Sequence, residues 1–369
     1  MKLDASTRWP TRKKGLFTIS LPRFRRYIIV YAILLWICLG SWVGLVSPRL
    51  REHNELLQAL DPSSREKIRG WFGTNSLPKF SDLVHLRTLD PGLLPSDKMP
   101  TGNNPKRKRL IVIGDVHGCL DELESLLQKT NFDPNNGDHL IFTGDLIAKG
   151  PKSIGVIDLA RKYRASCVRG NHEDRVLLLR RNVKAAASIR NKADYDIEPD
   201  PQEQSLANEL NDEQANWLDT CPVILKVGPI KGMGEVVVVH GGLVPGVELE
   251  SQDPSTVMSM RTIDLSSHVP STSSAGVSWT KLFNKHQSLL AVARQSAPRG
   301  ESVQHSSATT VIYGHDANTS PSLKKYTKGL DTNCVKGGKL SSMIIQDGGD
   351  SRIANVKCKN YMTKRKSKH

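Results

Sequence analysis

Cysteine is scarce in this sequence, which has six among 369 residues and no pair spaced as Cys-x-x-Cys. Cys38 lies in an apolar run near the N-terminus, so five cysteines remain for the rest of the chain: Cys119, Cys167, Cys221, Cys334 and Cys358. Because five is an odd number, at least one of these thiols is free or pairs with another chain. The sequence also lacks an internal repeat, and its length indicates one large domain with appendages.

Acidic residues are almost absent from the two ends of the chain. Of the formal net charge of +15, residues 1–26 carry +7, with a single acid, and residues 351–369 carry another +7, with no acid. The body between these ends is therefore nearly neutral. Charge runs of this kind are typical of solvated tails, so we expect no nucleic-acid function.

Long apolar runs are missing except at residues 27–46, which hold no formal charge. A helix of that length spans about 30 Å, the thickness of a bilayer core. The run is longer than the core of a signal peptide and no clear cleavage site follows it. We therefore expect an uncleaved transmembrane signal anchor, against the alternatives of a cleaved signal peptide or a buried core helix.

The charges around the apolar run predict its orientation. Seven basic residues precede it between positions 8 and 26, so the positive-inside rule keeps the N-terminus in the cytosol. Everything after residue 47 is then expected in a lumen or outside the cell, as a single-pass type II membrane protein. The sequon Asn318-Thr319-Ser320 is compatible with this orientation.

Two segments have the composition of connecting or terminal regions. Residues 47–105 contain recurrent Pro and Gly and end in a basic run, which is typical of a stem. Short helices are expected within the stem near residues 52–60 and 80–86. The basic residues 351–369 are expected to form a disordered tail.

Between these segments, residues 106–350 have the texture of an α/β domain. Apolar runs of strand length alternate with helical patterns, as in LIVIGD followed by DELESLLQK. Residues 185–220 are polar and helix-compatible, and we interpret them as a helical insertion. Asn211 is the predicted N-cap of the helix that leads to Trp217.

Five apolar strands end in polar residues beside Gly or Asn. The blocks are IGDVHG (113–118), TGDLIAKGP (143–151), RGNHE (169–173), VHGG (239–242) and YGHD (313–316). Ligands of α/β sheets bind at the carboxyl ends of strands, and glycine lets the backbone turn sharply there. We therefore expect one cluster of side chains at that edge, formed by Asp115, His117, Asp145, Asn171, His172, His240 and His315.

The side chains of this cluster suit divalent metals. Carboxylate and imidazole ligands favour Zn, Mn, Fe or Co. Two ions bridged by one carboxylate, about 3.5–4 Å apart, form the clamp that phosphoryl-transfer enzymes use. The alternative from another class is a catalytically dead domain kept as a membrane-bound binding module. Loss of a ligand would mark such a domain, and all six ligand positions are intact.

The five blocks together resemble the calcineurin-like, phosphoprotein-phosphatase-type metallophosphoesterases over about residues 109–349. The stretch GLDTNCVKGGKL (329–340) resembles the segment that follows the last ligand in that family. The resemblance implies a two-sheet β-sandwich flanked by helices. It implies metal ligands at Asp115, His117, Asp145 as the bridge, Asn171, His240 and His315. It also implies His172 as the acid that protonates the leaving group, and Lys149, Arg169 and Arg261 as phosphate-binding residues.

Residues 148–150 depart from the family. Its protein phosphatases carry Asp-Arg-Gly where this chain has Ala148-Lys149-Gly150. The missing Asp normally orients the histidine acid, and Lys149 lacks the bidentate fork of Arg. A phosphoanhydride releases phosphate, a better leaving group than an alkoxide, and needs less help from an acid. Ala148 therefore favours phosphoanhydride substrates, unless another residue orients His172.

Two branches of the family share features with this chain. Alanine at position 148 resembles the diadenosine-tetraphosphate hydrolases. The anchor and stem resemble the fungal vacuolar endopolyphosphatases that depend on zinc. The second resemblance implies two Zn ions, cleavage of inorganic polyphosphate within its chain, and a catalytic domain in the vacuole lumen. Dinucleoside polyphosphates and phosphoproteins stand as alternative substrates, and the basic C-terminal tail is either an attractant for a polyanion or an ordinary solvated tail.

Overall fold

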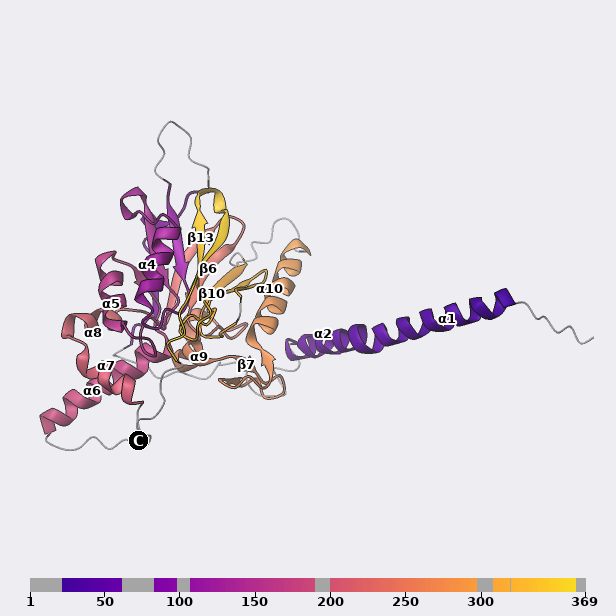
Figure 1. Ribbon diagram of the computed structural model, residues 1–369, viewed down its shortest axis with the longest axis horizontal. Helices are drawn as coiled ribbons and strands as arrows, with labels where there is room; N and C mark the ends of the chain where they lie inside the picture. The colour runs from indigo at the N-terminus through magenta and orange to yellow at the C-terminus, as the bar shows by residue number, and fades with distance from the viewer. Residues whose placement is uncertain are drawn as a thin grey trace, which may run out of the picture. The chain divides into compact units, whose positions relative to one another are not determined.

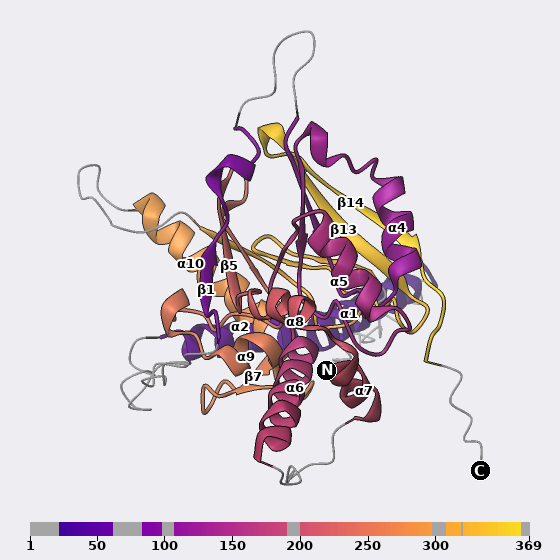
Figure 2. The same ribbon diagram turned by 90° about the vertical axis from the view of Figure 1, so that its left-hand side faces the viewer.

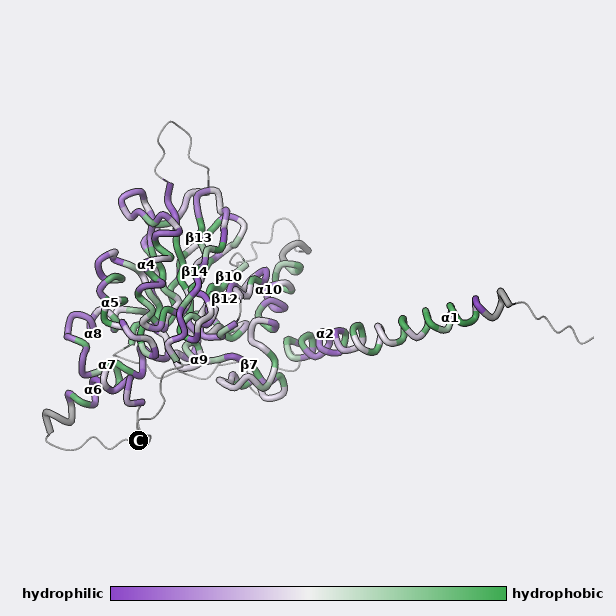
Figure 3. Tube along the Cα trace, viewed as in Figure 1, coloured by the Kyte–Doolittle hydropathy of each residue, from purple (hydrophilic) through white to green (hydrophobic). Residues whose placement is uncertain are grey.

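The computed structural model describes residues 22–61, 83–97, 107–189, 200–296, 308–318 and 320–362. The chain forms two compact units, Met1–Leu57 and Gln58–His369. The first contains helix α1 (Pro22–Ser41) and a π-helical turn η1 (Trp42–Val46), followed by helix α2 (Ser47–Ala59), which runs on to the boundary. Within the described residues, Arg26–Ala59 is long and apolar enough to cross a membrane, a test that a signal sequence also passes. The apolar character of α1 is visible in Figure 3.

The second unit contains two large mixed sheets and one small sheet (Figure 1). The six-stranded sheet has the order β1 (Leu86–Thr88), β5 (Ile224–Ile230), β6 (Gly234–Val239), β10 (Thr309–Tyr313), β12 (Thr327–Gly329) and β11 (Ser322–Leu323). The five-stranded sheet has the order β14 (Ser351–Lys357), β13 (Lys339–Gln346), β2 (Arg109–Ile113), β3 (Asp138–Phe142) and β4 (Ser166–Cys167). The small sheet joins β8 (Pro270–Ser271), β7 (Thr262–Ile263) and β9 (Val277–Ser278).

Strand β2 shows how the layers are held together. Its side chains alternate between the two faces of the sheet, as the pleat of a strand requires. Leu110 and Val112 pack in one buried cluster with Val236 and Val238 of the other large sheet. Ile111 and Ile113 pack in a second cluster with the inner faces of two helices. The expected α/β fold with two mixed sheets is thus confirmed.

Helices cover the outer face of the five-stranded sheet and one end of the molecule. Helices α4 (Leu120–Lys129) and α5 (Ser153–Lys162) are neighbours, and α4 lies along β13 and β14 (Figure 2). Both helices contribute leucine, valine or isoleucine side chains to the cluster beneath that sheet. Three more helices follow β4: α6 (Asn171–Ile189), α7 (Pro201–Glu209) and α8 (Asp212–Asp219). Later in the described residues come α9 (Pro254–Ser259) and α10 (Trp279–Ser296).

The predicted N-cap at Asn211 is confirmed. Its side chain accepts a hydrogen bond from the backbone N–H of Gln214, and the side chain of Gln214 accepts one from the N–H of Asn211. This reciprocal capping box satisfies two amides at the start of α8. The predicted helical insertion accordingly contains α7 and α8 within its described residues.

Two strands lie beyond the boundaries that the sequence suggests for the α/β domain. Residues 86–88, assigned to the stem, form β1 and pair in parallel with β5. Residues 351–357, assigned to the tail, form β14 and pair with β13 along seven residues. Both are edge strands with exposed or half-buried positions, so neither carries the apolar pattern that marks the central strands. The helix expected near residues 80–86 is replaced at its described end by β1.

Four cysteines form two disulfides. Cys167 at the end of β4 bonds to Cys221, 54 positions later and just after α8. Cys334 bonds to Cys358 after β14. Cys119 is the odd cysteine of the second unit and is free and buried. Disulfides of this kind persist in oxidising compartments.

Candidate metal centre

The polar residues of the five blocks meet where five strands end. Asp115 follows β2 and Asp145 follows β3, while His240 and His315 follow β6 and β10 of the other sheet. Asn171 begins α6, just beyond β4. The carboxyl ends of strands from both large sheets therefore face one another across the site.

The site consists of two groups of metal-binding side chains that share Asp145. His117, Asp145 and His172 form one group, and Asp145, His240 and His315 form the other, with candidate ligand atoms in each within 4.8 Å of one another. One oxygen of Asp145, Oδ2, lies 3.5 Å from His117 Nε2, and the other, Oδ1, lies 3.3 Å from His240 Nε2. A carboxylate with one oxygen on each side has the geometry of a bridging ligand.

Asp115 and Asn171 lie at the edges of these groups. A carboxylate oxygen of Asp115 is 4.0 Å from His117 Nε2, and both oxygens accept from the backbone N–H of His315. The side-chain oxygen of Asn171 lies 3.1 Å from His240 Nε2. The structure thus brings together all six predicted ligands, and it adds His172 to the first group.

Backbone carbonyls fix the orientation of the three histidine ligands. His117 Nδ1 lies 3.1 Å from the carbonyl oxygen of Ile147, His240 Nδ1 lies 2.9 Å from that of Thr143, and His315 Nε2 lies 2.9 Å from that of Ser259. A carbonyl oxygen only accepts, so these nitrogens carry the proton. In the neutral ring the other nitrogen keeps a lone pair, which is how second-shell partners prepare histidine for a metal.

The backbone at the site is held in a conformation that side chains other than glycine rarely adopt. His117, Asp145 and His315 have φ of 46°, 51° and 63°, and Ala148 and Lys149 have 67° and 64°. Left-handed residues of this kind cost roughly 1–3 kcal/mol each and cluster at functional sites. The fold therefore stores strain in the loops that aim the ligands.

Two glycines make room for the carboxylates. A Cβ at Gly170 would lie 2.3 Å from Asp145 Oδ1, and a Cβ at Gly314 would lie 2.0 Å from Asp115 Oδ1. Real Cβ atoms do not approach so closely, so only glycine allows these backbones to pass the ligands.

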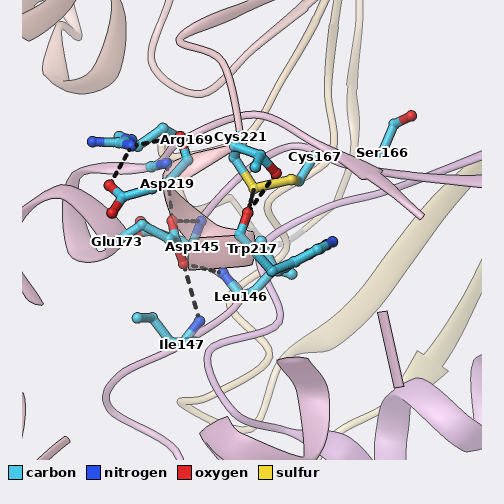
Figure 4. Close-up of a disulfide and its surroundings, with 12 residues drawn as sticks. Asp145, Leu146, Ile147, Ser166, Cys167, Arg169, Glu173, Trp217, Asp219 and Cys221 are labelled. Atoms are coloured by element: carbon cyan, nitrogen blue, oxygen red, sulfur yellow. Dashed lines mark hydrogen bonds and ion pairs between the residues drawn. A yellow bond between two sulfur atoms is a disulfide. The ribbon is translucent and has the colours of Figure 1, made fainter. Parts of the chain in front are cut away.

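Glu173 secures the loop that carries Asp145 (Figure 4). Its Oε2 accepts hydrogen bonds from the backbone N–H groups of Asp145 and Gly170, at 2.8 and 2.9 Å. Its Oε1 accepts from those of Leu146 and Ile147, at 2.8 and 3.2 Å. A fully buried carboxylate thus satisfies four backbone donors around the shared ligand.

The charges of the site favour a bound cation. Burial and the neighbouring carboxylate of Asp331 raise the pKa of Asp115 well above its usual range. Burial acts the same way on Asp145, but the surrounding imidazoles of His240, His172 and His117 outweigh it and hold its pKa well below that range. Burial lowers the pKa of His240, yet Asp145 outweighs it and raises that pKa to about 10. Asp115 and Asp145 are both buried, so their ionised forms are stabilised by positive charge between them.

The side chain of Lys149 occupies a position that suits a metal ion. Its Nζ lies 3.0 Å from His117 Nε2, the nitrogen that holds a lone pair toward the first group. The histidine and carboxylate donors are those that borderline divalent metals prefer. The residues present therefore fit two divalent ions.

The three predicted phosphate-binding residues lie in different surroundings. Lys149 borders the first group, and Arg261 borders the second, since its Nη2 donates to the carbonyl of His315 at 3.3 Å. Arg169 is buried, with Nη1 3.4 Å from Asp174 Oδ1 and Nη2 3.0 Å from Asp219 Oδ1. Its Nε has no hydrogen-bond partner within the part of the chain that the structure describes.

Sequence reasoning missed three acidic residues at the site. Glu173 stands within the block RGNHE, in the first turn of α6, where an acidic side chain can accept hydrogen bonds from free backbone N–H groups. Asp331, buried beside Asp115, lies in the segment after the last ligand. Glu203 of α7 reaches His172 from 31 positions away, and no local pattern marks it.

Comparison with known proteins shows similarity to phosphoesterases in both sequence and structure. A family model described as calcineurin-like phosphoesterase matches residues 108–329. The zinc-dependent endopolyphosphatase of Saccharomyces cerevisiae is 28% identical over 265 residues, which is 65% of this chain and 76% of that protein. The symmetrical bis(5'-nucleosyl)-tetraphosphatase of Yersinia pestis is 36% identical over 142 residues, 38% of this chain and 44% of that enzyme. The match thus spans less than half of the bacterial enzyme. The crystal structure of a candidate diadenosine tetraphosphatase has 27% identity and a TM-score of 0.51, and covers 75% of this chain and 99% of that one.

Proposed function

The protein belongs to the calcineurin-like phosphoesterase family, and from its site we propose that it is a two-metal hydrolase that cleaves inorganic polyphosphate at internal bonds of the polymer. The observation that carries the hydrolase is Asp145, shared between two buried groups of histidine and aspartate. The observation that favours polyphosphate is the likeness to the yeast endopolyphosphatase over about two thirds of this chain.

In this proposal Asp115 and His117 would hold the first ion, Asn171, His240 and His315 would hold the second, and both ions would share Asp145. Zinc is the favoured metal because the yeast relative is named for it and because zinc accepts imidazole and carboxylate ligands. When bound, two divalent ions supply positive charge for the phosphoryl oxygens and make a water molecule more acidic.

The chain's own side chains would then bind and orient the substrate. Lys149 and Arg261 border the two groups and carry positive charge toward the phosphoryl oxygens. For Arg169 the same role is proposed from its motif alone, because its guanidinium is buried against Asp174 and Asp219. His172 would hold the proton that the departing oxygen takes, because its Nε2 lies 3.8 Å from Asp145 Oδ2 at the shared ligand.

We further propose that the catalytic unit works in an oxidising lumen, behind a single N-terminal anchor, and that this lumen is the vacuole. The two disulfides and the apolar helix Arg26–Ala59 support an oxidising, membrane-bound setting. The assignment of this lumen to the vacuole rests on the resemblance to the fungal enzymes alone.

A second candidate function is the hydrolysis of dinucleoside tetraphosphates. It is favoured by the match to the Yersinia tetraphosphatase and by the structural likeness to the candidate diadenosine tetraphosphatase. Both substrates are phosphoanhydrides, so the same metal centre suits either. Serine and threonine phosphoproteins are the third alternative, and Ala148 argues against them unless another residue orients His172.

The test uses the full chain, purified in detergent, stripped with a chelator, and supplied in turn with Zn, Mn, Co or Mg. The substrates are long-chain polyphosphate, diadenosine tetraphosphate and a phosphoserine peptide, with chain length followed on a gel beside phosphate release. Shortening of polyphosphate through intermediate lengths supports the proposal. Phosphate released singly from polyphosphate would contradict cleavage within the chain, and preference for the dinucleotide would favour the second candidate.

A further inference from the structure

Helix α7 brings a carboxylate into contact with the proposed acid. Glu203 Oε1 lies 2.5 Å from His172 Nδ1, and the two side chains are only 8% and 10% exposed. Glu203 is the third residue of α7, whose start is capped by Asp200 through the backbone N–H of Gln202. The helix is therefore anchored at the end that carries the carboxylate.

The opposite nitrogen of the same imidazole faces the metal centre. His172 Nε2 lies 3.8 Å from Asp145 Oδ2, and its ring meets the ring of His117 edge-on at 5.1 Å between centroids. An ionised carboxylate can only accept a hydrogen bond, so His172 Nδ1 is the donor toward Glu203. The ring is thus held with one nitrogen on Glu203 and the other toward the reacting groups.

Arg175 completes the contact from α6. Its Nη2 lies 3.2 Å from Glu203 Oε1 and lies over the imidazole, 2.9 Å from His172 Nδ1 and 3.1 Å from His172 Nε2. His172 Nδ1 donates its proton to Glu203 and cannot also accept one from Arg175. The ion pair with the carboxylate of Glu203 therefore holds the Arg175 guanidinium in place. The arginine is 51% exposed, whereas Glu203 is buried, so Glu203 is the member that fixes the ring.

We propose that Glu203 is the positioning residue for His172 and replaces the acid that position 148 lacks, so that the site still protonates poor leaving groups. Ala148 is 1% exposed and offers only a methyl group. The restriction to phosphoanhydrides that Ala148 suggested is thereby lifted, and phosphate monoesters become substrates of the same site. This inference rests on the proposed hydrolytic function of the metal centre.

The chemical step balances with these groups. A water oxygen forms a bond to phosphorus and gives up a proton to the medium, while the bond from phosphorus to the leaving oxygen breaks. The leaving oxygen keeps the electron pair and takes the proton from His172 Nε2. Glu203 holds the Nδ1 proton throughout and stabilises the charged imidazole before transfer.

The experiment compares two aryl phosphates that differ in the quality of the leaving group. Wild type, Glu203→Gln and the control Glu209→Gln are prepared as full chains in detergent. Glu209 lies on the same helix and is exposed, so its change matches the loss of charge without touching His172. For each protein kcat and KM are measured with 4-nitrophenyl phosphate and with phenyl phosphate, together with metal content and melting temperature.

Glu203→Gln should lower kcat for phenyl phosphate about 100-fold, within the range expected of acid catalysis, and lower it far less for 4-nitrophenyl phosphate. KM, metal content and melting temperature should stay near the wild-type values, and Glu209→Gln should change none of these. In a His172→Gln background the Glu203 change should have no further effect on kcat, because the carboxylate acts only through the imidazole. If Glu203→Gln does not fold, Glu203→Asp, which keeps the buried charge, tests the same contact.

An equal loss with both esters, or a loss of metal, would reduce Glu203 to a structural residue and overturn the inference. So would a wild type that cleaves polyphosphate and neither ester, although the proposed function would then stand. A wild type that cleaves both esters but no phosphoanhydride would overturn the proposed substrate and leave the role of Glu203 intact.

Discussion

Replacing Glu173 with Gln tests whether one buried carboxylate supports the metal-binding loop. Each oxygen of Glu173 accepts two backbone N–H groups. In the variant the amide oxygen keeps two of them, while the amide nitrogen faces the other two and leaves them without an acceptor. Hydrogen bonds to charged groups contribute about 1.5–3 kcal/mol each, so the loss is about 3–6 kcal/mol.

The expected net effect of Glu173→Gln lies at the lower end of that range. Burial, and after it the charge of Asp145, raises the pKa of Glu173, so the variant also removes an unfavourable buried charge. We expect a fall of about 3 kcal/mol in the free energy of unfolding. We also expect faster hydrogen exchange at the two amides that lose their acceptor, which are those of Leu146 and Ile147 or those of Asp145 and Gly170, and the first pair lies within residues 145–147.

Urea unfolding, with the linear extrapolation applied to both proteins, measures the change. Glu124→Gln is the matched control, because Glu124 is exposed on α4, and should stay within about 0.5 kcal/mol of the wild type. Exchange at residues 145–147 is read by mass spectrometry on the same samples. An unfolding free energy for Glu173→Gln within about 1 kcal/mol of the wild-type value, which is the error of the extrapolation, together with unchanged exchange, would refute the support role.

Three further predictions test other features. Burial lowers the pKa of His139 to about 4, so the unfolded chain binds a proton that the folded chain refuses; stability should fall by at most about 3 kcal/mol as the pH falls from 6.5 toward 4. His139→Asn should flatten that dependence in urea titrations, and an unchanged slope would contradict it. Replacing Cys167 and Cys221 with Ser should lower the unfolding free energy by up to about 4 kcal/mol, from the loop of 54 positions; equal midpoints before and after would count against it. Gly314→Ala should weaken metal binding about tenfold or more because its Cβ would lie 2.0 Å from a ligand oxygen, measured by metal content. Gly44→Ala, with nothing within 4 Å of its Cβ, is the control, and equal metal content in the two would contradict the prediction.

The fold and the cluster of candidate metal ligands can be predicted from the sequence because their signals are local. Central strands such as β2 and β3 are apolar on both faces, and each ends in a glycine next to a polar residue. A strand end of this type specifies both the turn and the direction of the ligand. The six ligand positions could therefore be named without knowledge of the tertiary structure.

Edge strands and contacts across long separations could not be predicted in this way. β1 and β14 are half exposed, so their composition resembles that of a stem or a tail. Glu203 could not be predicted either, because it is one acid in a polar helix and gains its partner only when α7 packs against α6. Arg169 shows another limit of local reasoning, because the motif does not reveal that Asp174 and Asp219 engage its guanidinium.

The disulfide between Cys167 and Cys221 has a consequence for the covalent topology of the chain. The bond closes a ring that contains both His172 and Glu203. A single peptide-bond break between His172 and Glu203 would leave two fragments that remain joined by the disulfide, each carrying one partner of the pair. Such a nicked molecule would run as one band without reductant and as two bands with it.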